Sequence, residues 1–231
     1  MKFRLGRLKI SEALKDLAAK KIKKQKIEIT RATKKKLVQL AKVVGLIESQ
    51  GLPDYLVLKE LGNNLGSGIF LHPKAEPILK GDVIVPYSGI VALSPRDECE
   101  ESDYMFCILH DLVLNKEEQA EFDPKNRFHP RRLYSLDVDA QKKGNFARFI
   151  NHCSKPNVEA DVLRIPPNSL GLTSAPCEVI YLAKKKILPG EQLLVCYEGD
   201  DKSYWGAMKV TPLPMTPRTF RLNKDLQLIS S

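Results

Sequence analysis

The cysteines and histidines of the sequence do not show the spacing of a metal site. Its five cysteines, an odd number, are Cys99, Cys107, Cys153, Cys177 and Cys196. They include no C-x-C or C-x-x-C pair, which argues against a disulfide framework or a zinc cluster and favours free buried thiols. His152 could act as an acid, a base or a metal ligand, but no second histidine or carboxylate falls at ligand spacing. Metal-dependent chemistry is therefore not indicated.

Two glycines flank a serine at Gly66-Ser67-Gly68, directly after a β-rich run. By itself this pattern is typical of a tight turn. No third glycine completes a G-x-G-x-x-G and no helical pattern follows, so a dinucleotide site is not indicated.

The segment 144–157, GNFARFINHCSKPN, is much more specific. It resembles the G-N-x-x-R-F-[IV]-N-H-S-C-x-P-N signature of SET domains. Other landmarks of that family occur in the family's order, namely LGSGIF at 65–70, Tyr87-Ser88-Gly89, Asp139-Ala140, and Gly190-Glu191-Gln192-Leu193 leading to Tyr197. The resemblance covers about residues 55–205, and the layout is similar to the compact SET proteins of chlamydia-like bacteria.

The resemblance implies a protein-lysine N-methyltransferase that uses S-adenosyl-L-methionine, with histones or histone-like basic proteins as substrates. Methyl transfer from a sulfonium is an in-line displacement, so cofactor and amine must meet from opposite ends of a narrow channel. The lysine, whose ordinary pKa is about 10.4, must first lose a proton. A nearby positive charge and desolvation both lower that pKa, so a hydroxyl that orients the amine can suffice without a strong base.

By resemblance, Tyr197 is that catalytic hydroxyl and Tyr87 is a second tyrosine lining the lysine channel. The cofactor-binding residues that the resemblance implies are Gly66, Ser67, Gly68, Ile69, Tyr104, Arg148, Phe149, Asn151, His152 and Trp205. The alternatives are a strand-end core tyrosine for Tyr197, an ordinary strand aromatic for Tyr87, and core packing for Tyr104 and Trp205.

The sequence departs from the family pattern at two places near the site. The signature's Ser-Cys is Cys153-Ser154 here, and Cys196 stands before the catalytic tyrosine, where Asp is common. No C-x-C-x4-C cluster follows Tyr197, so we expect no metal and no zinc-held flap. The Trp205 region, the 206–231 tail or a second subunit of a homodimer would then close the lysine channel.

Apolar residues at helical spacing predict an amphipathic helix over 10–24 and a second one from Leu37 to Ile47. From Tyr55 onward, short β-rich runs alternate with turn residues. Further helix is expected around 94–101 and near 144–151, and a loop over 115–132. We therefore expect a mainly β SET-domain (β-clip) fold of several small sheets. The resemblance implies that the C-terminal segment of this domain is threaded through a loop. A basic helical hairpin is expected to precede the domain.

Three regions are predicted. Residues 1–52 form a basic helical element, 53–205 the SET domain, and 206–231 a C-terminal tail. The sequence has 231 residues, of which 43% are hydrophobic and 28% charged. No apolar run approaches the length of a membrane span, and no signal peptide is evident. We expect an intracellular protein, in the cytoplasm or, if delivered as a bacterial effector, in a host nucleus.

The positive charge is concentrated at the N-terminal end. Residues 1–42 carry a net charge of +12. The whole chain carries +9, so the remaining residues sum to −3. This element could contact nucleic acid or chromatin, or it could be a packing or dimerisation hairpin with a solvated lysine face. Two alternatives to the enzyme therefore stay open: a catalytically weak SET-fold module that binds lysine tails, and a nucleic-acid-binding protein acting through residues 1–42.

Overall fold

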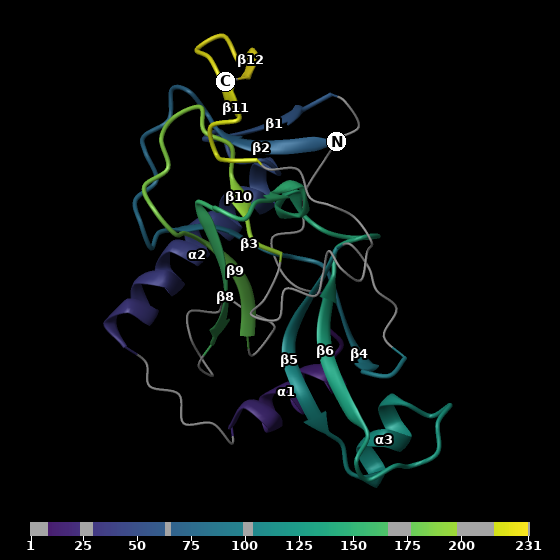
Figure 1. The fold of residues 1–231 in the computed structure, drawn as a ribbon. Helices are drawn as coiled ribbons and strands as arrows, with labels where there is room; N and C mark the ends of the chain where they lie inside the picture. Colours follow the sequence, from purple (N-terminus) through teal and green to yellow (C-terminus); the bar gives the residue numbers. More distant parts are fainter. Residues whose placement is uncertain are drawn as a thin grey trace.

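The computed structural model describes residues 9–23, 30–62, 66–98, 104–165, 177–197 and 215–230. Within these residues the chain forms five small sheets, three α-helices and one 3-10 helix (Figure 1). The expectation of a mainly β chain built from several small sheets is confirmed.

Two antiparallel three-stranded sheets carry most of the core. The first has the order β4 (Ile90–Pro95), β6 (Leu133–Asp139) and β5 (Met105–Val113). The second has the order β3 (Val83–Pro86), β9 (Cys177–Ala183) and β8 (Val158–Arg164). Every residue of the central strand β9 is buried, because strands flank both of its edges and both of its faces are covered.

Three short strand pairs complete the β structure. They are β1 (Leu56–Glu60) with β2 (Ser67–Leu71), β7 (Asn151–His152) with β10 (Leu194–Val195), and β11 (Phe220–Leu222) with β12 (Leu228–Ser230). The β7–β10 pair is parallel, and the other two are antiparallel. A 3-10 helix, η1 (Phe146–Phe149), directly precedes β7 and accounts for the helical pattern expected near 144–151.

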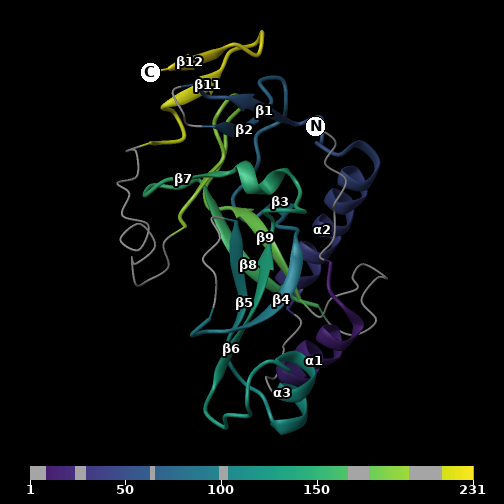
Figure 2. The same ribbon diagram turned by 90° about the vertical axis from the view of Figure 1, so that its right-hand side faces the viewer.

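The N-terminal helices α1 (Glu12–Lys23) and α2 (Arg31–Gln50) cover different sheets. Helix α2 begins at a Thr30 cap and packs Leu37, Leu40 and Val44 on β3, β8 and β9. Helix α1 lies below α2 in the view of Figure 2, beside α3. Both helices also bury residues in the central cluster formed with the strands, namely Ala18, Ile22, Val43 and Ile47. The boundary predicted between residues 52 and 53 stays a prediction.

Two local expectations are wrong. Segment 115–132, expected to be a loop, contains helix α3 (Lys116–Phe122), which a capping box between Asn115 and Glu118 begins. The helix expected around 94–101 does not start at Ser94, since Ser94 and Pro95 pair with β6 as the end of β4. That pairing places Pro95 at the strand end, a position that tolerates the missing N–H.

The segment Glu191–Val195 is buried between β2 and the chain that follows β7. On one side, the Leu193 amide donates to the Ile69 carbonyl at 2.8 Å. On the other, the buried Asn157 side chain accepts from the Leu194 amide and donates to the Gln192 carbonyl, both at 2.9 Å. The resemblance expects a C-terminal segment that is threaded through a loop, and that threading stays a prediction.

A partly buried ion-pair cluster fastens α1 to α3. Burial alone would raise the pKa of the Glu118 carboxyl, but hydrogen bonds from Lys20 at 2.7 Å and Lys21 at 2.8 Å outweigh it and lower that pKa to about 2. A lowered carboxyl pKa stabilises the folded state above the ordinary value, and this contribution is lost as the pH falls toward 2.

We expect Glu118→Gln to lower the free energy of unfolding by about 1–3 kcal/mol at neutral pH, because two charge-assisted hydrogen bonds are lost. The difference from the parent protein should shrink as the pH falls below about 4.5, where the parent carboxylate begins to lose its advantage. Urea unfolding at neutral and acidic pH measures both effects. Glu117→Gln, on the exposed face of the same helical turn, is the control, and an equal loss in it would contradict the assignment.

Candidate active site

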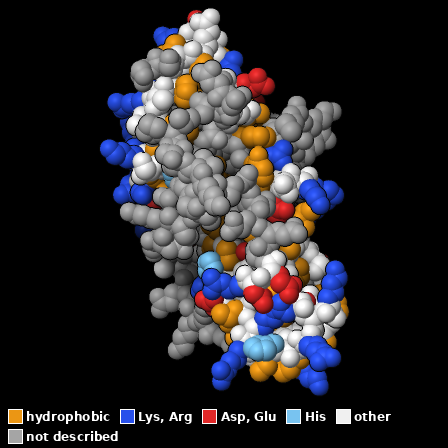
Figure 3. Space-filling model, turned by 45° about the vertical axis from the view of Figure 1, so that its right-hand side comes forward, with side chains coloured by type: hydrophobic (Ala, Val, Ile, Leu, Met, Phe, Trp, Pro, Cys, Tyr) orange, Lys and Arg blue, Asp and Glu red, His pale blue; other side chains and the backbone are white. Residues whose placement is uncertain are grey.

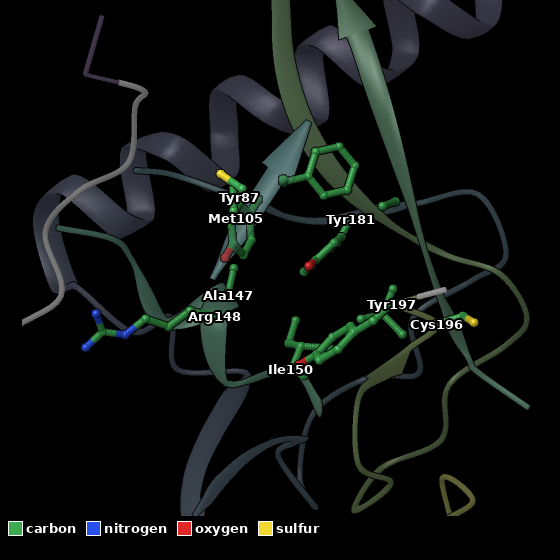
Figure 4. A pocket seen from close by; sticks show the side chains of 11 residues that line it. Tyr87, Met105, Ala147, Arg148, Ile150, Tyr181, Cys196 and Tyr197 are labelled. Atoms are coloured by element: carbon green, nitrogen blue, oxygen red, sulfur yellow. The ribbon is translucent and has the colours of Figure 1, made fainter. Parts of the chain in front are cut away.

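A cavity of about 110 Å³ lies where β5, β8, β9, the 3-10 helix η1 and the end of β10 meet (Figure 4). It is lined by Tyr87, Met105, Phe106, Ala147, Arg148, Ile150, Ala160, Tyr181, Val195, Cys196 and Tyr197. Sites that enclose a whole small molecule usually measure about 300–1,000 Å³. This cavity is therefore of the size expected for a channel that admits one side chain.

Tyr197 is held by the strand pair β7–β10 that precedes it. Its backbone amide donates to Nδ1 of His152 at 3.1 Å, and its hydroxyl donates to the Ile150 carbonyl at 2.8 Å. The rings of His152 and Tyr197 lie 5.5 Å apart. His152 therefore positions the backbone of Tyr197 through Nδ1, the ring nitrogen that accepts in this contact.

Tyr87 lines the same cavity from the end of β3. It is buried, and its hydroxyl donates to the Tyr104 carbonyl at 2.7 Å. Burial is the main reason why the pKa of Tyr87 is raised well above its ordinary value. Tyr87 is therefore a neutral hydrogen-bonding group at any physiological pH.

Tyr181 is a third tyrosine of the cavity, and the sequence reasoning did not find it. Its ring lies 5.7 Å from that of Tyr87, and its hydroxyl points into the space between Tyr87 and Tyr197 (Figure 4). Burial strongly raises the pKa of Tyr181, so it also stays protonated. The feature that could have indicated Tyr181 is its polar hydroxyl in a strand that is buried at every position.

The predicted cofactor-binding glycines form a backbone cradle with Asn151. Gly66 has φ +67°, a conformation that favours glycine. The Asn151 amide donates to the Ser67 carbonyl at 3.0 Å and so ties β7 to β2. A Cβ built on Gly68 would lie 2.5 Å from Gln192 Nε2 and 3.4 Å from Asn151 Nδ2. A side chain at position 68 would therefore fill the cradle.

Gln192 adds a buried amide to this cradle. It is fully buried, and neither its Nε2 nor its Oε1 has a hydrogen-bond partner among the residues that the structure describes. An unpaired buried amide is costly, and such groups usually await a ligand or serve a function. The amides of Asn151 and Gln192, beside the backbone of Gly68, fit the charged amino-acid end of a small ligand. The sequence reasoning named Gln192 as a family landmark but did not assign it to the site.

Of the other predicted cofactor residues, Arg148 lines the cavity, and Tyr104 and Phe149 contact its guanidinium. The Arg148 guanidinium lies 4.9 Å from the centre of the Phe149 ring and 5.9 Å from that of Tyr104. It donates to the Ala140 carbonyl at 2.9 Å and points away from the cavity (Figure 4). Trp205 lies outside the described residues, and so does the tail from 206 to 214.

The described part of the tail, 215–230, does not line the cavity. It packs Phe220, Leu222 and Leu228 against β1 and β2. The thiol of Cys153 donates a hydrogen bond to the carbonyl of Met215, the first residue of this part, at 2.8 Å. Cys153 therefore has a structural contact, and burial raises the pKa of its thiol. Which segment closes the cavity stays a prediction.

Among the described residues, no group of three or more histidine, cysteine, aspartate or glutamate side chains is arranged to hold a metal ion. Within the same part of the chain, no helix is long and apolar enough to span a membrane.

The model of the family described as SET domain matches residues 74–198, more than half of the chain. This chain belongs to the SET-domain family. Among solved structures it is similar to ATXR5 in complex with mono-methylated histone H3.1, with a TM-score of 0.53 and 19% identity over 84% of this chain and 80% of that chain. At this identity the likeness concerns the fold.

Two curated relatives are named "Histone-lysine N-methyltransferase, H3 lysine-4 specific". The one from Schizosaccharomyces pombe is 27% identical over 123 residues, which are 53% of this chain and 11% of the relative. The one from Mycosarcoma maydis is 29% identical over 132 residues, covering 53% of this chain and 7% of the relative. The chain thus spans about a tenth of the length of these relatives.

Proposed function

We propose that this chain is a protein-lysine N-methyltransferase that uses S-adenosyl-L-methionine and acts on histones or histone-like basic proteins. The observation that carries the proposal is the tyrosine-lined cavity, too small for a whole cofactor, beside a separate glycine cradle. Membership of the SET-domain family and the activities named for its relatives support it.

Bound S-adenosyl-L-methionine would supply an electrophilic methyl group on its sulfonium. The Gly66–Ile69 backbone, the Asn151 amide and the Gln192 amide would bind its amino-acid part. Because Gly68 carries no side chain, the backbone can approach this ligand closely.

The substrate lysine would enter the tyrosine cavity and lose its proton there. Among the described lining residues there is no carboxylate and no histidine that could act as a strong base. Desolvation by Phe106, Ile150 and Val195 disfavours the ammonium form of the lysine instead. The hydroxyls of Tyr197, Tyr87 and Tyr181 would then orient the neutral amine toward the methyl group.

Incubation with isotope-labelled S-adenosyl-L-methionine and mixed histones or bacterial DNA-binding proteins tests the proposal. We expect label on lysine, located by mass spectrometry of the products. Cofactor binding without any transfer would favour the lysine-tail binding module instead. Failure to bind the cofactor at all would contradict the proposed enzyme.

Gly68→Ala should weaken cofactor binding at least tenfold, which corresponds to about 1.4 kcal/mol. The added Cβ would lie 2.5 Å from Gln192 Nε2 and occupy the cradle. Isothermal titration with S-adenosylhomocysteine measures the change. Gly45→Ala is the control, because a Cβ there meets nothing within 4 Å, and it should leave the affinity unchanged. Unaltered affinity in Gly68→Ala would place the cofactor elsewhere.

A further inference from the structure

A separate cavity of about 270 Å³ lies between the chain after β7, the chain after β9 and the start of the 215–230 segment. Its wall consists of Lys155, Lys185, Lys186, Leu188, Glu191, Thr216, Pro217 and Arg218. None of these residues lines the tyrosine cavity. We call this the lysine pocket. Its four cations are exposed, whereas its one carboxylate, Glu191, is buried.

Among the described residues, the lysines of this pocket differ from its arginine in their contacts with carboxylates. Glu191 is engaged by Arg218 Nε at 3.1 Å and by the Leu188 amide at 2.9 Å. Within the described part of the chain, Lys155, Lys185 and Lys186 form no ion pair. Three uncompensated ammonium groups around one hollow create a positive potential that a bound anion would relieve.

Some cations elsewhere in the described part of the chain are compensated by carboxylates. The cavity beside α3 contains Arg96, Arg131 and Arg132, of which Arg96 pairs with Asp111 at 2.5 Å and Arg132 with Asp97 at 3.2 Å. Figure 3 shows acidic and basic side chains together in the middle of the lower part of the molecule, and basic but no acidic side chains along its lower edge.

The lysines of the two basic helices, α1 and α2, are also partly paired with carboxylates. Carboxylates pair with five of their lysines, namely Lys15, Lys20, Lys21, Lys35 and Lys36. Charge that is neutralised within the chain contributes little to binding an external polyanion. The lysine pocket is distinguished by having three lysines without an ion pair, among the described residues, gathered around one hollow.

We propose that the lysine pocket binds phosphate groups of a nucleic-acid backbone. Recognition of a single phosphorylated side chain typically relies on the bidentate fork of free arginines, and the one arginine here is engaged by Glu191. Lysines act as mobile point charges, which suits backbone contacts that carry no sequence information. This site differs from the N-terminal element, which the sequence charge alone would favour.

Binding of fluorescein-labelled short duplex DNA, followed by anisotropy over a range of salt concentrations, tests this proposal. The triple variant Lys155→Gln, Lys185→Gln, Lys186→Gln should bind more weakly. The slope of log K against log salt should fall by about one unit for each lysine removed. The matched control is Arg31→Gln, Lys34→Gln, Lys42→Gln on the exposed face of α2, which removes the same charge. It should keep the parent slope.

Equal losses in both variants would overturn the proposal, because they would show attraction by net charge alone. Absence of DNA binding by the parent protein would overturn it as well. Displacement of the duplex by a phosphoserine peptide at matching concentration would assign the pocket to phosphoproteins instead. All six side chains are exposed or partly exposed, so circular dichroism should show both variants folded. The readout needs no methyl transfer, so the result is independent of the proposed enzyme activity.

Discussion

Tyr197→Phe should lower kcat by about 10²–10³, the usual loss when one positioned hydroxyl is removed from a reacting centre. Phenylalanine keeps the ring that packs 5.5 Å from His152 and keeps the backbone bond to that histidine. It loses only the hydroxyl that donates to the Ile150 carbonyl at 2.8 Å. The transfer of labelled methyl to histone, measured under single-turnover conditions, reports the change.

The affinity for S-adenosylhomocysteine should stay within about twofold in Tyr197→Phe, because no cradle residue is altered. Tyr134→Phe is the matched control. Tyr134 is also buried, and its hydroxyl donates to Asp123 at 2.8 Å, but it lies outside the tyrosine cavity. This control should lose stability and keep kcat. An unchanged kcat in Tyr197→Phe would remove Tyr197 from the catalytic role.

Asn157→Leu should destabilise the fold by about 3–5 kcal/mol. Asn157 is fully buried and satisfies both the Leu194 amide and the Gln192 carbonyl. Leucine has a similar size but leaves two buried backbone groups without partners, each costing about 1–3 kcal/mol. Domains are stable by only about 5–15 kcal/mol, so this loss is a large fraction of the total.

Urea unfolding followed by circular dichroism measures the effect of Asn157→Leu. Asn126→Ala is the control, because the Asn126 amide bonds to Asp123 and Glu98 on a surface loop that water can reach. It should change the unfolding free energy by less than about 1 kcal/mol. A loss below this level in Asn157→Leu would show that the Asn157 side chain contributes little to holding the segment Glu191–Val195.

The two N-terminal helices could be predicted because each has a continuous apolar face. The pattern over 10–24 matches α1, and the pattern from Leu37 to Ile47 lies within α2. Their placement could not be predicted, since it depends on which sheet each apolar face meets. Helix α1 packs Leu17 against Leu114 and Tyr134, which lie about a hundred residues further along the chain.

Helix α3 was missed for a related reason. Its buried residues are Glu118 and Gln119, so no apolar periodicity marks it. Distant partners compensate the buried carboxylate, because the lysines that pair with Glu118 belong to α1. Only the capping pair Asn115 and Glu118 was a local signal.

Some residues of the candidate site could also be predicted from the sequence, and others could not. Residues in ordered motifs, such as Gly66–Ile69, Asn151 and Tyr197, could be named from the family resemblance, and their roles stay predictions. Tyr181 and Gln192 could not, because what distinguishes them is their surroundings. One projects a hydroxyl into the cavity from a buried strand, and the other holds an unpaired amide beside Gly68.

The buried segment Glu191–Val195 sets the order in which this molecule can be completed during synthesis. Its partners on β2 are made about 120 residues earlier, as the bonds from Leu193 to Ile69 and from Leu71 to Glu191 require. At translation rates of about 5–20 residues per second, β2 waits roughly 6–24 s for that segment. Such distant pairings also slow folding. Until Glu191–Val195 is made, the nascent chain therefore keeps one edge of β2 paired with β1 and the other edge without its partner.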